Sequence, residues 1–210
     1  EELKQLFGVN LPTDTWDNIS AQIRHIYALG QVTQELVNTR GRYRRQWLWD
    51  SQNLRDYLLL DFEIPPYSNF GLTLPFQKQL ALNAKLYPVV SQQRLRLEDN
   101  LMSFNDLSLT LVAPKGFENF DQAFTQYANG LKQYPLQLVR FFWLEQLRLV
   151  KQDKVIYLVD QDQKMCEIEI KQFVELWFLV GNEPFSAGVE WNGLQLKLVS
   201  IWQGGHFECL

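Results

Sequence analysis

The sequence has few cysteines, few histidines and no long apolar run, and each shortage excludes a class of protein. Its two cysteines, Cys166 and Cys209, are too few for a disulfide framework, which favours a reducing, cytoplasmic compartment. The sequence contains no stretch of about eighteen apolar residues, so it predicts no membrane-spanning helix. Aspartate and glutamate (24) outnumber lysine and arginine (20), so the net charge of −4 argues against a general nucleic-acid binder.

Motifs that carry catalysis or hold phosphate are also missing. The sequence contains no G-x-S-x-G elbow, no P-loop and no G-x-G-x-x-G pattern. Glu167 and Glu169 lie on one face of a predicted strand and could do acid–base chemistry, but such a pair is more often the solvated face of a half-buried strand. We therefore predict that the chain is not an enzyme.

Metal ligands are equally sparse. His206 and Cys209 stand three residues apart, whereas His25 and Cys166 lie far from them and from each other. A structural zinc site needs about four ligands, usually in two close pairs. The sequence therefore predicts no metal site and no cofactor.

What the sequence does contain is material for a packed core. Apolar residues make up 46% and aromatic residues 14% of the 210 positions, which fits one large domain or two small ones. No internal repeat is evident. The chain begins at Glu1 without an initiator methionine, which we take as the mark of a piece of a longer protein.

Residues 1–64 are predicted to form a helical subdomain. Ile19, Ile23, Ile26 and Tyr27 recur near a 3.6-residue period, which predicts a helix over 14–29. Further helical stretches are expected from Val32 to Gly41 and over 51–60, the last ending before a proline pair.

Residues 65–210 are predicted to form a β-rich domain with one packed helix over 119–134. Phe120, Phe124, Tyr127 and Leu131 fall on one face of that helix. Apolar runs follow at hairpin spacing, over 143–150, 154–159, 165–170, 173–180, 185–191 and 194–202. Asn192-Gly193 predicts a two-residue turn. The predicted fold class is therefore α+β, with a helical N-terminal part followed by an antiparallel β-meander.

One polar segment is unusual, because four arginines are interleaved with aromatic residues. Arginine beside aromatics is typical of protein-interaction hot spots and of surfaces that stack on nucleic-acid bases. A solvated helix end with tryptophans in the core explains it as well. The candidate partner-binding residues are Arg40, Arg42, Tyr43, Arg44, Arg45, Trp47 and Trp49.

Several segments resemble a known family. Three segments occur in the same order as in the C-terminal region of bacterial SWIM zinc-finger proteins. They are the segment 84–88 (Ala-Lys-Leu-Tyr-Pro), the predicted helix Phe120–Ala128 with Leu131 and Pro135, and the run Glu190-Trp191-Asn192-Gly193. The resemblance covers about residues 75–202. The zinc ligands of that family, C-x-C followed by C-x-H, are absent from this sequence.

The resemblance implies a non-enzymatic scaffold or protein-interaction module without the finger. It also implies partners such as MoxR-type ATPases or von Willebrand-type proteins. The alternative is a nucleic-acid-associated protein that uses residues 40–49.

Overall fold

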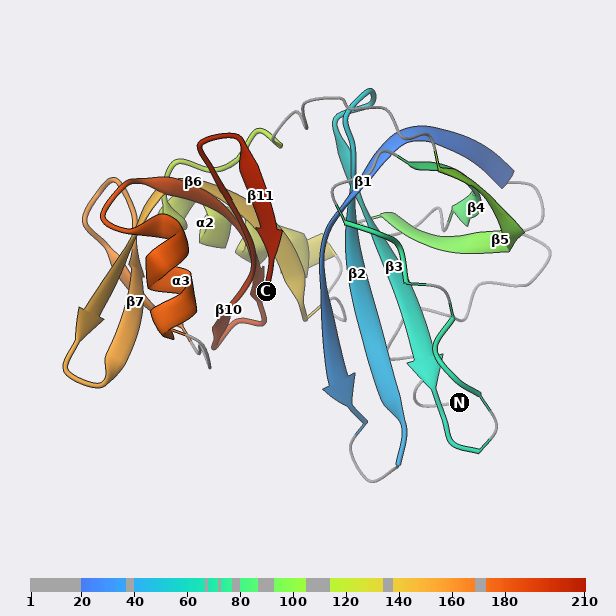
Figure 1. Cartoon of the computed structure of the whole chain (residues 1–210), viewed down its shortest axis with the longest axis horizontal. Helices are drawn as coiled ribbons and strands as arrows, with labels where there is room; N and C mark the ends of the chain where they lie inside the picture. The colour runs from blue at the N-terminus through green and yellow to red at the C-terminus, as the bar shows by residue number, and fades with distance from the viewer. Residues whose placement is uncertain are drawn as a thin grey trace. The chain divides into compact units, whose positions relative to one another are not determined.

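The computed structural model describes residues 20–36, 40–66, 68–71, 73–76, 80–86, 93–104, 114–133, 138–168 and 173–210. The chain divides into two compact units, Glu1–Val112 and Ala113–Leu210 (Figure 1). Strands dominate both units. None of the helices in this part of the chain is long and apolar enough to cross a membrane.

The first unit is a closed five-stranded barrel in the order β1-β2-β3-β5-β4. The pairing of β3 with β5 is parallel, and the other described pairings are antiparallel. The long, bent β1 pairs with β4 through its first half and with β2 through its second half (Figure 1). The strands are β1 (Ser20–Glu35), β2 (Arg42–Asp50), β3 (Arg55–Glu63), β4 (Leu80–Leu86) and β5 (Gln93–Phe104).

The second unit repeats this pairing scheme. Its sheet runs β11-β10-β8-β7-β6-β9, and β10 also pairs with β9, so that β6, β7, β8, β10 and β9 form a closed ring. Here the parallel pairing joins β8 and β10. The elements are α2 (Phe120–Gln133), β6 (Arg140–Gln152), β7 (Val155–Val159), β8 (Met165–Ile168), α3 (Phe173–Val180), β9 (Phe185–Trp191), β10 (Leu196–Gln203) and β11 (His206–Cys209).

Both rings therefore join their five strands in the order first, second, third, fifth, fourth. This is the strand order of the OB-fold, a five-stranded Greek-key barrel. The residue registers agree as well as the order. Equivalent partners in the two barrels are Ile26–Leu80 and Leu147–Phe185, Leu48–Tyr57 and Leu158–Cys166, and Leu59–Leu95 and Ile168–Leu196.

Each barrel has its own apolar core. In the first, Ile26, Leu48 and Leu80 are almost fully buried, and Leu74, from the connection between β3 and β4, joins them. In the second, Leu147 and Leu158 occupy the matching places, and Leu176 of α3 enters the core from the equivalent connection. The side chain that fills this place thus comes from a helix in one barrel and from non-helical chain in the other.

The predicted α+β fold class with a helical N-terminal part is wrong, because strands dominate both units. Residues 14–19 lie outside the described residues, but 20–35 form β1, and residues 55–63 form β3. A β-bulge misled the periodicity: on β1, Ile23 and Ile26 are three residues apart, yet they oppose Leu82 and Leu80, which are two apart. The extra residue makes a strand imitate helical spacing.

The predicted helix over 51–60 is also wrong, because a local pattern typical of a helix start occurs here in a turn. The Asp50 carboxylate accepts hydrogen bonds from the backbone N–H groups of Gln52 and Asn53, both at 3.0 Å. These are the bonds of a helix N-cap, but here they close the turn between β2 and β3. The two compact units of the structure are divided between Val112 and Ala113, whereas the sequence-based prediction divides the chain between residues 64 and 65.

The predicted meander is corrected in two places. The apolar run 173–180 is helix α3, since a short apolar run does not by itself distinguish helix from strand. Asn192-Gly193 is part of a four-residue turn, because Trp191 pairs with Leu196. Gly193 does have a positive φ, of 91°.

The helix predicted over 119–134 is confirmed as α2. Phe120 and Tyr127 are buried in the core of the second barrel, and Phe124 and Leu131 pack against it half-buried. Asn119 acts as the N-cap, because its Oδ1 accepts the backbone N–H of Gln122 at 2.9 Å.

Candidate functional site

The arginine–tryptophan segment forms strand β2, and strand alternation divides its side chains between two faces. Leu48 points into the core of the first barrel with Tyr57 of β3 opposite it. Arg42 and Arg44, at even positions, share that inner side of the strand. Tyr43, Arg45, Trp47 and Trp49 fall on the outer side. Arg40 is exposed and precedes the strand.

The two inner arginines are engaged by carboxylates. Arg44 is 4% exposed; its Nη2 lies 2.8 Å from Oδ2 of Asp61 and donates to the carbonyl of Gly71 at 3.0 Å. Arg42 forms an ion pair with Glu63. Both guanidinium groups also lie over the ring of Phe70, at 4.9 Å for Arg44 and 5.4 Å for Arg42. These arginines hold the chain after β3 against the barrel, and their charge is matched locally.

The outer side of β2 is largely buried. Trp47, Arg45 and Trp49 are 0%, 6% and 8% exposed, and only Tyr43 is half-exposed. Tyr43 donates to Oε1 of Gln34 at 2.7 Å, and Arg45 lies over its ring at 5.0 Å. The seven candidate residues therefore do not form one open surface, since Arg44, Arg45, Trp47 and Trp49 are buried.

The equivalent face of the second barrel is more exposed, although Val159 on its middle strand is buried. We call it the β6–β7–β8 face and define it by Arg148, Val150, Tyr157, Met165 and Glu167. Two rows cross the three strands: Arg148 opposes Val159, which opposes Met165, and Val150 opposes Tyr157, which opposes Glu167. The alternate residues Leu149, Leu158 and Ile168 point into the core, which fixes these rows on the outside.

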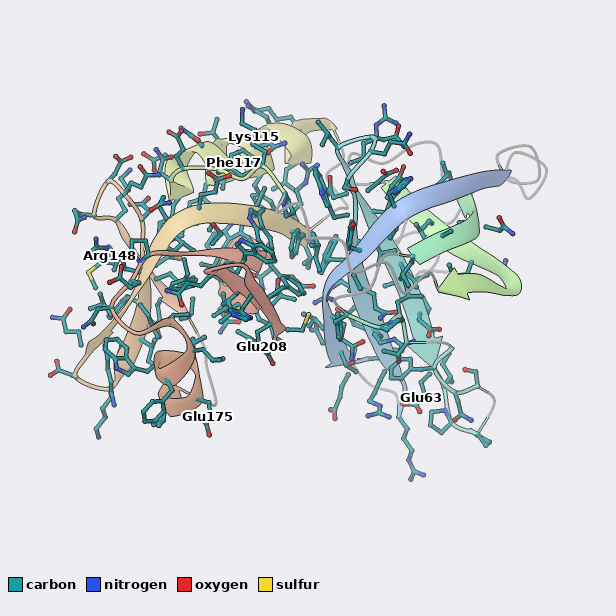
Figure 2. The ribbon with its side chains drawn as sticks, turned by 45° about the horizontal axis from the view of Figure 1, so that its top comes forward. Glu63, Lys115, Phe117, Arg148, Glu175 and Glu208 are labelled. Atoms are coloured by element: carbon teal, nitrogen blue, oxygen red, sulfur yellow. The ribbon has the colours of Figure 1, made fainter. Side chains whose placement is uncertain are left out.

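The β6–β7–β8 face mixes apolar and charged groups. Val150 is 37% and Met165 46% exposed, Tyr157 is half-buried, and Glu167 is exposed. Arg148 is also exposed and is labelled in Figure 2. The face thus carries one cation and one anion around an apolar centre. The sequence reasoning missed it, although the alternation within the runs 143–150 and 154–159 separates these residues from the core.

The candidate metal-ligating, acid–base and nucleophilic residues do not form a cluster among the described residues. Among the described residues, no three His, Cys, Asp or Glu side chains lie close enough to hold a metal ion. Glu167 is exposed on β8, and Glu169 lies outside the described residues. Cys166 and Cys209 are free thiols. Burial, followed by the nearby Glu167 carboxylate, raises the pKa of Cys166 to about 11, which leaves it a poor nucleophile at neutral pH.

The chain was compared with protein-family models, with curated proteins and with solved structures, and it matches none of them. The resemblance to SWIM proteins therefore stays a prediction from the sequence segments quoted for it.

Proposed function

We propose that the chain is a non-enzymatic protein-interaction module that binds a protein partner through the β6–β7–β8 face. The observation that carries the proposal is the exposure of Val150, Met165 and Tyr157 between Arg148 and Glu167. Tyrosine, methionine and arginine are enriched where proteins meet, because they offer large contact areas with polar ends. In OB-folds the face of strands two and three binds oligonucleotides and oligosaccharides, so this face has a precedent as a binding surface in barrels of this topology.

Charge favours a protein partner over a nucleic acid. On the β6–β7–β8 face Arg148 is offset by Glu167, and on β2 the cations of Arg42 and Arg44 are matched by Glu63 and Asp61. Phosphate binding depends on cations that are free to replace counterions. The barrel topology keeps a nucleic-acid role as the second candidate, because OB-folds bind single strands.

We further propose a cytoplasmic location. Both cysteines are free thiols, which is the ordinary state of cysteine in a reducing compartment.

The experiment compares the protein with the variant Met165→Asp, which places a charge at the most exposed apolar residue of the face. Leu54→Asp is the control, because Leu54 is an apolar residue, 69% exposed, in the turn between β2 and β3 of the other barrel. A captured partner is purified and titrated against each form by calorimetry. We expect Met165→Asp to weaken binding by about tenfold or more, a loss of about 1.4 kcal/mol, and Leu54→Asp to leave it unchanged.

A second arm addresses nucleic acid. Labelled single-stranded DNA and RNA are titrated by fluorescence anisotropy at low and at physiological salt. We do not expect a nucleic-acid affinity that decreases steeply as the salt concentration rises. A steep salt dependence that Arg148→Glu abolishes would replace the protein-partner proposal with the nucleic-acid one.

A further inference from the structure

Helix α3 presents an apolar surface that the barrel does not use. Leu176 and Val180 lie one turn apart and are 1% and 2% exposed, so they anchor the helix in the core. On the opposite arc, Val174, Phe178 and Leu179 are 60%, 83% and 51% exposed. A phenylalanine exposed to this degree beside two exposed aliphatic side chains is an unusual solvent-facing feature for a helix that already has its buried face.

The helix is held firmly in this position. Its last turn is closed by the backbone N–H of Gly181, which donates to the carbonyl of Trp177 at 2.8 Å. The side-chain amide of Gln203, at the end of β10, donates to the carbonyls of Val180 at 3.0 Å and Glu183 at 3.3 Å. A fixed surface loses little conformational entropy when a partner binds.

Two charged side chains among the described residues of α3 and the turn after it, Glu175 and Glu183, are acidic. Glu175 is the charged residue within α3; it is exposed and lies one turn before Leu179 on the apolar arc (Figure 2). Glu183, also exposed, follows in the turn after the helix. A symmetric contact between two copies of this surface would bring Glu175 near another carboxylate, and an anionic membrane would be repelled in the same way.

We propose that the exposed arc of α3 binds an amphipathic partner segment whose apolar side chains cover Phe178 and whose lysine or arginine residues face Glu175 and Glu183. This inference rests on the proposed protein-interaction function and adds a second contact surface with a stated partner chemistry. Apolar contact supplies the affinity, and the acidic groups select the charge of the partner.

The probe is a labelled peptide of leucine and lysine, about four helical turns long, with its leucines on one face. A matched peptide carries glutamate in place of every lysine. Both are titrated against the whole chain, against Phe178→Asp and against the control Leu194→Asp. Leu194 is 90% exposed and lies in the turn between β9 and β10, so its variant tests for non-specific attraction to exposed apolar groups.

We expect the leucine–lysine peptide to bind with a micromolar Kd and the leucine–glutamate peptide not to bind. Phe178→Asp should weaken binding by about tenfold or more and Leu194→Asp by less than about twofold. Glu175→Lys should also weaken it, while thermal melting shows that each variant is folded. Equal losses in both aspartate variants, or equal binding of both peptides, would overturn the proposal.

Two further outcomes would also overturn it, by naming another occupant. A dimer in sedimentation that Phe178→Asp dissociates would assign the surface to a second copy of the chain. Flotation with phosphatidylglycerol vesicles that Phe178→Asp abolishes would assign it to a membrane. If the peptide does not bind α3 but Met165→Asp still weakens partner binding, only the proposal for α3 is overturned and the proposed function stands. The failure of one proposal can therefore be distinguished from the failure of the other.

Discussion

His25 and Gln146 occupy the same position in the two barrels. Each lies on the long first strand where its pairing shifts from the fourth strand to the second, and each has a positive φ, of 61° and 56°. Both side chains are exposed. A left-handed residue at the bend lets one strand join both sides of a barrel, so this conformation belongs to the topology rather than to the side chain.

The bulge predicts a characteristic response to substitution. A β-branched residue resists positive φ, so Gln146→Val should destabilise the fold by about 1–2 kcal/mol, whereas Gln146→Gly should be neutral or slightly stabilising. The measurement is the free energy of unfolding in urea. Gln152→Val, on an exposed and regular part of the same strand, is the control and should change little. Equal effects of valine at both positions would contradict the assignment.

The sequence revealed the elements whose signals are local. Helix α2 follows from Phe120, Phe124 and Tyr127 at helical spacing, and the turn glycine Gly193 follows from its need for positive φ. The apolar runs after residue 143 marked most strands of the second barrel correctly. These features depend on neighbours in the sequence, so a reading of one segment at a time recovers them.

The repeated barrel was not predicted, because its signal lies in pairings between distant residues. The parallel contact of Ile168 with Leu196 and the bulges on both first strands leave little trace in composition. One trace does exist. Trp47-Leu48-Trp49-Asp50 and Tyr157-Leu158-Val159-Asp160 both place a core leucine two residues before a turn aspartate. Trp47 is buried and its equivalent Tyr157 is half-exposed, and this difference depends on tertiary packing. The sequence alone therefore made the candidate site on β2 look more exposed than it is.

Asp160 should be a strong stabiliser of the second barrel. It is 2% exposed, and its carboxylate accepts the backbone N–H groups of Phe120 and Lys164, both at 2.9 Å. Asp160→Ala leaves the buried N–H of Phe120 and the part-buried N–H of Lys164 without their acceptor, and it removes a negative group from the start of α2. We expect a loss of about 2–4 kcal/mol in the free energy of unfolding, measured by chemical denaturation.

The control for this prediction is Asp162→Ala. Asp162 is exposed and accepts one hydrogen bond, from the side chain of Asn119 at 2.8 Å. We expect a loss below about 1 kcal/mol. If both alanine variants unfolded at the same urea concentration, the turn would not hold the helix as described.

Phe124 should anchor α2 through its aromatic contacts. Its ring stacks on Trp191 with centroids 4.5 Å apart and on Phe120 at 5.8 Å. Phe124→Ala should cost about 3 kcal/mol, at the lower end for phenylalanine because the side chain is half-buried. Gln126→Ala, on the exposed side of the same helix, should change the melting temperature little. Matching melting curves for the two variants would mean that α2 is peripheral to the core.

Cys166 should react slowly in the folded protein and faster once unfolded. Burial and the Glu167 carboxylate raise its pKa from 9.0 to about 11, so at pH 8 the thiolate is about a hundredfold scarcer than in the unfolded chain. The rate of alkylation is measured in the variant Cys209→Ser, in buffer and in urea. Because the folded pKa is the higher one, the thiol contributes stability below pH 9 that is lost as the pH rises through 11. The urea midpoint of Cys209→Ser should therefore fall over this interval more than that of a variant that also carries Cys166→Ala. Equal alkylation rates in buffer and in urea would show that the thiol is solvated in the folded barrel.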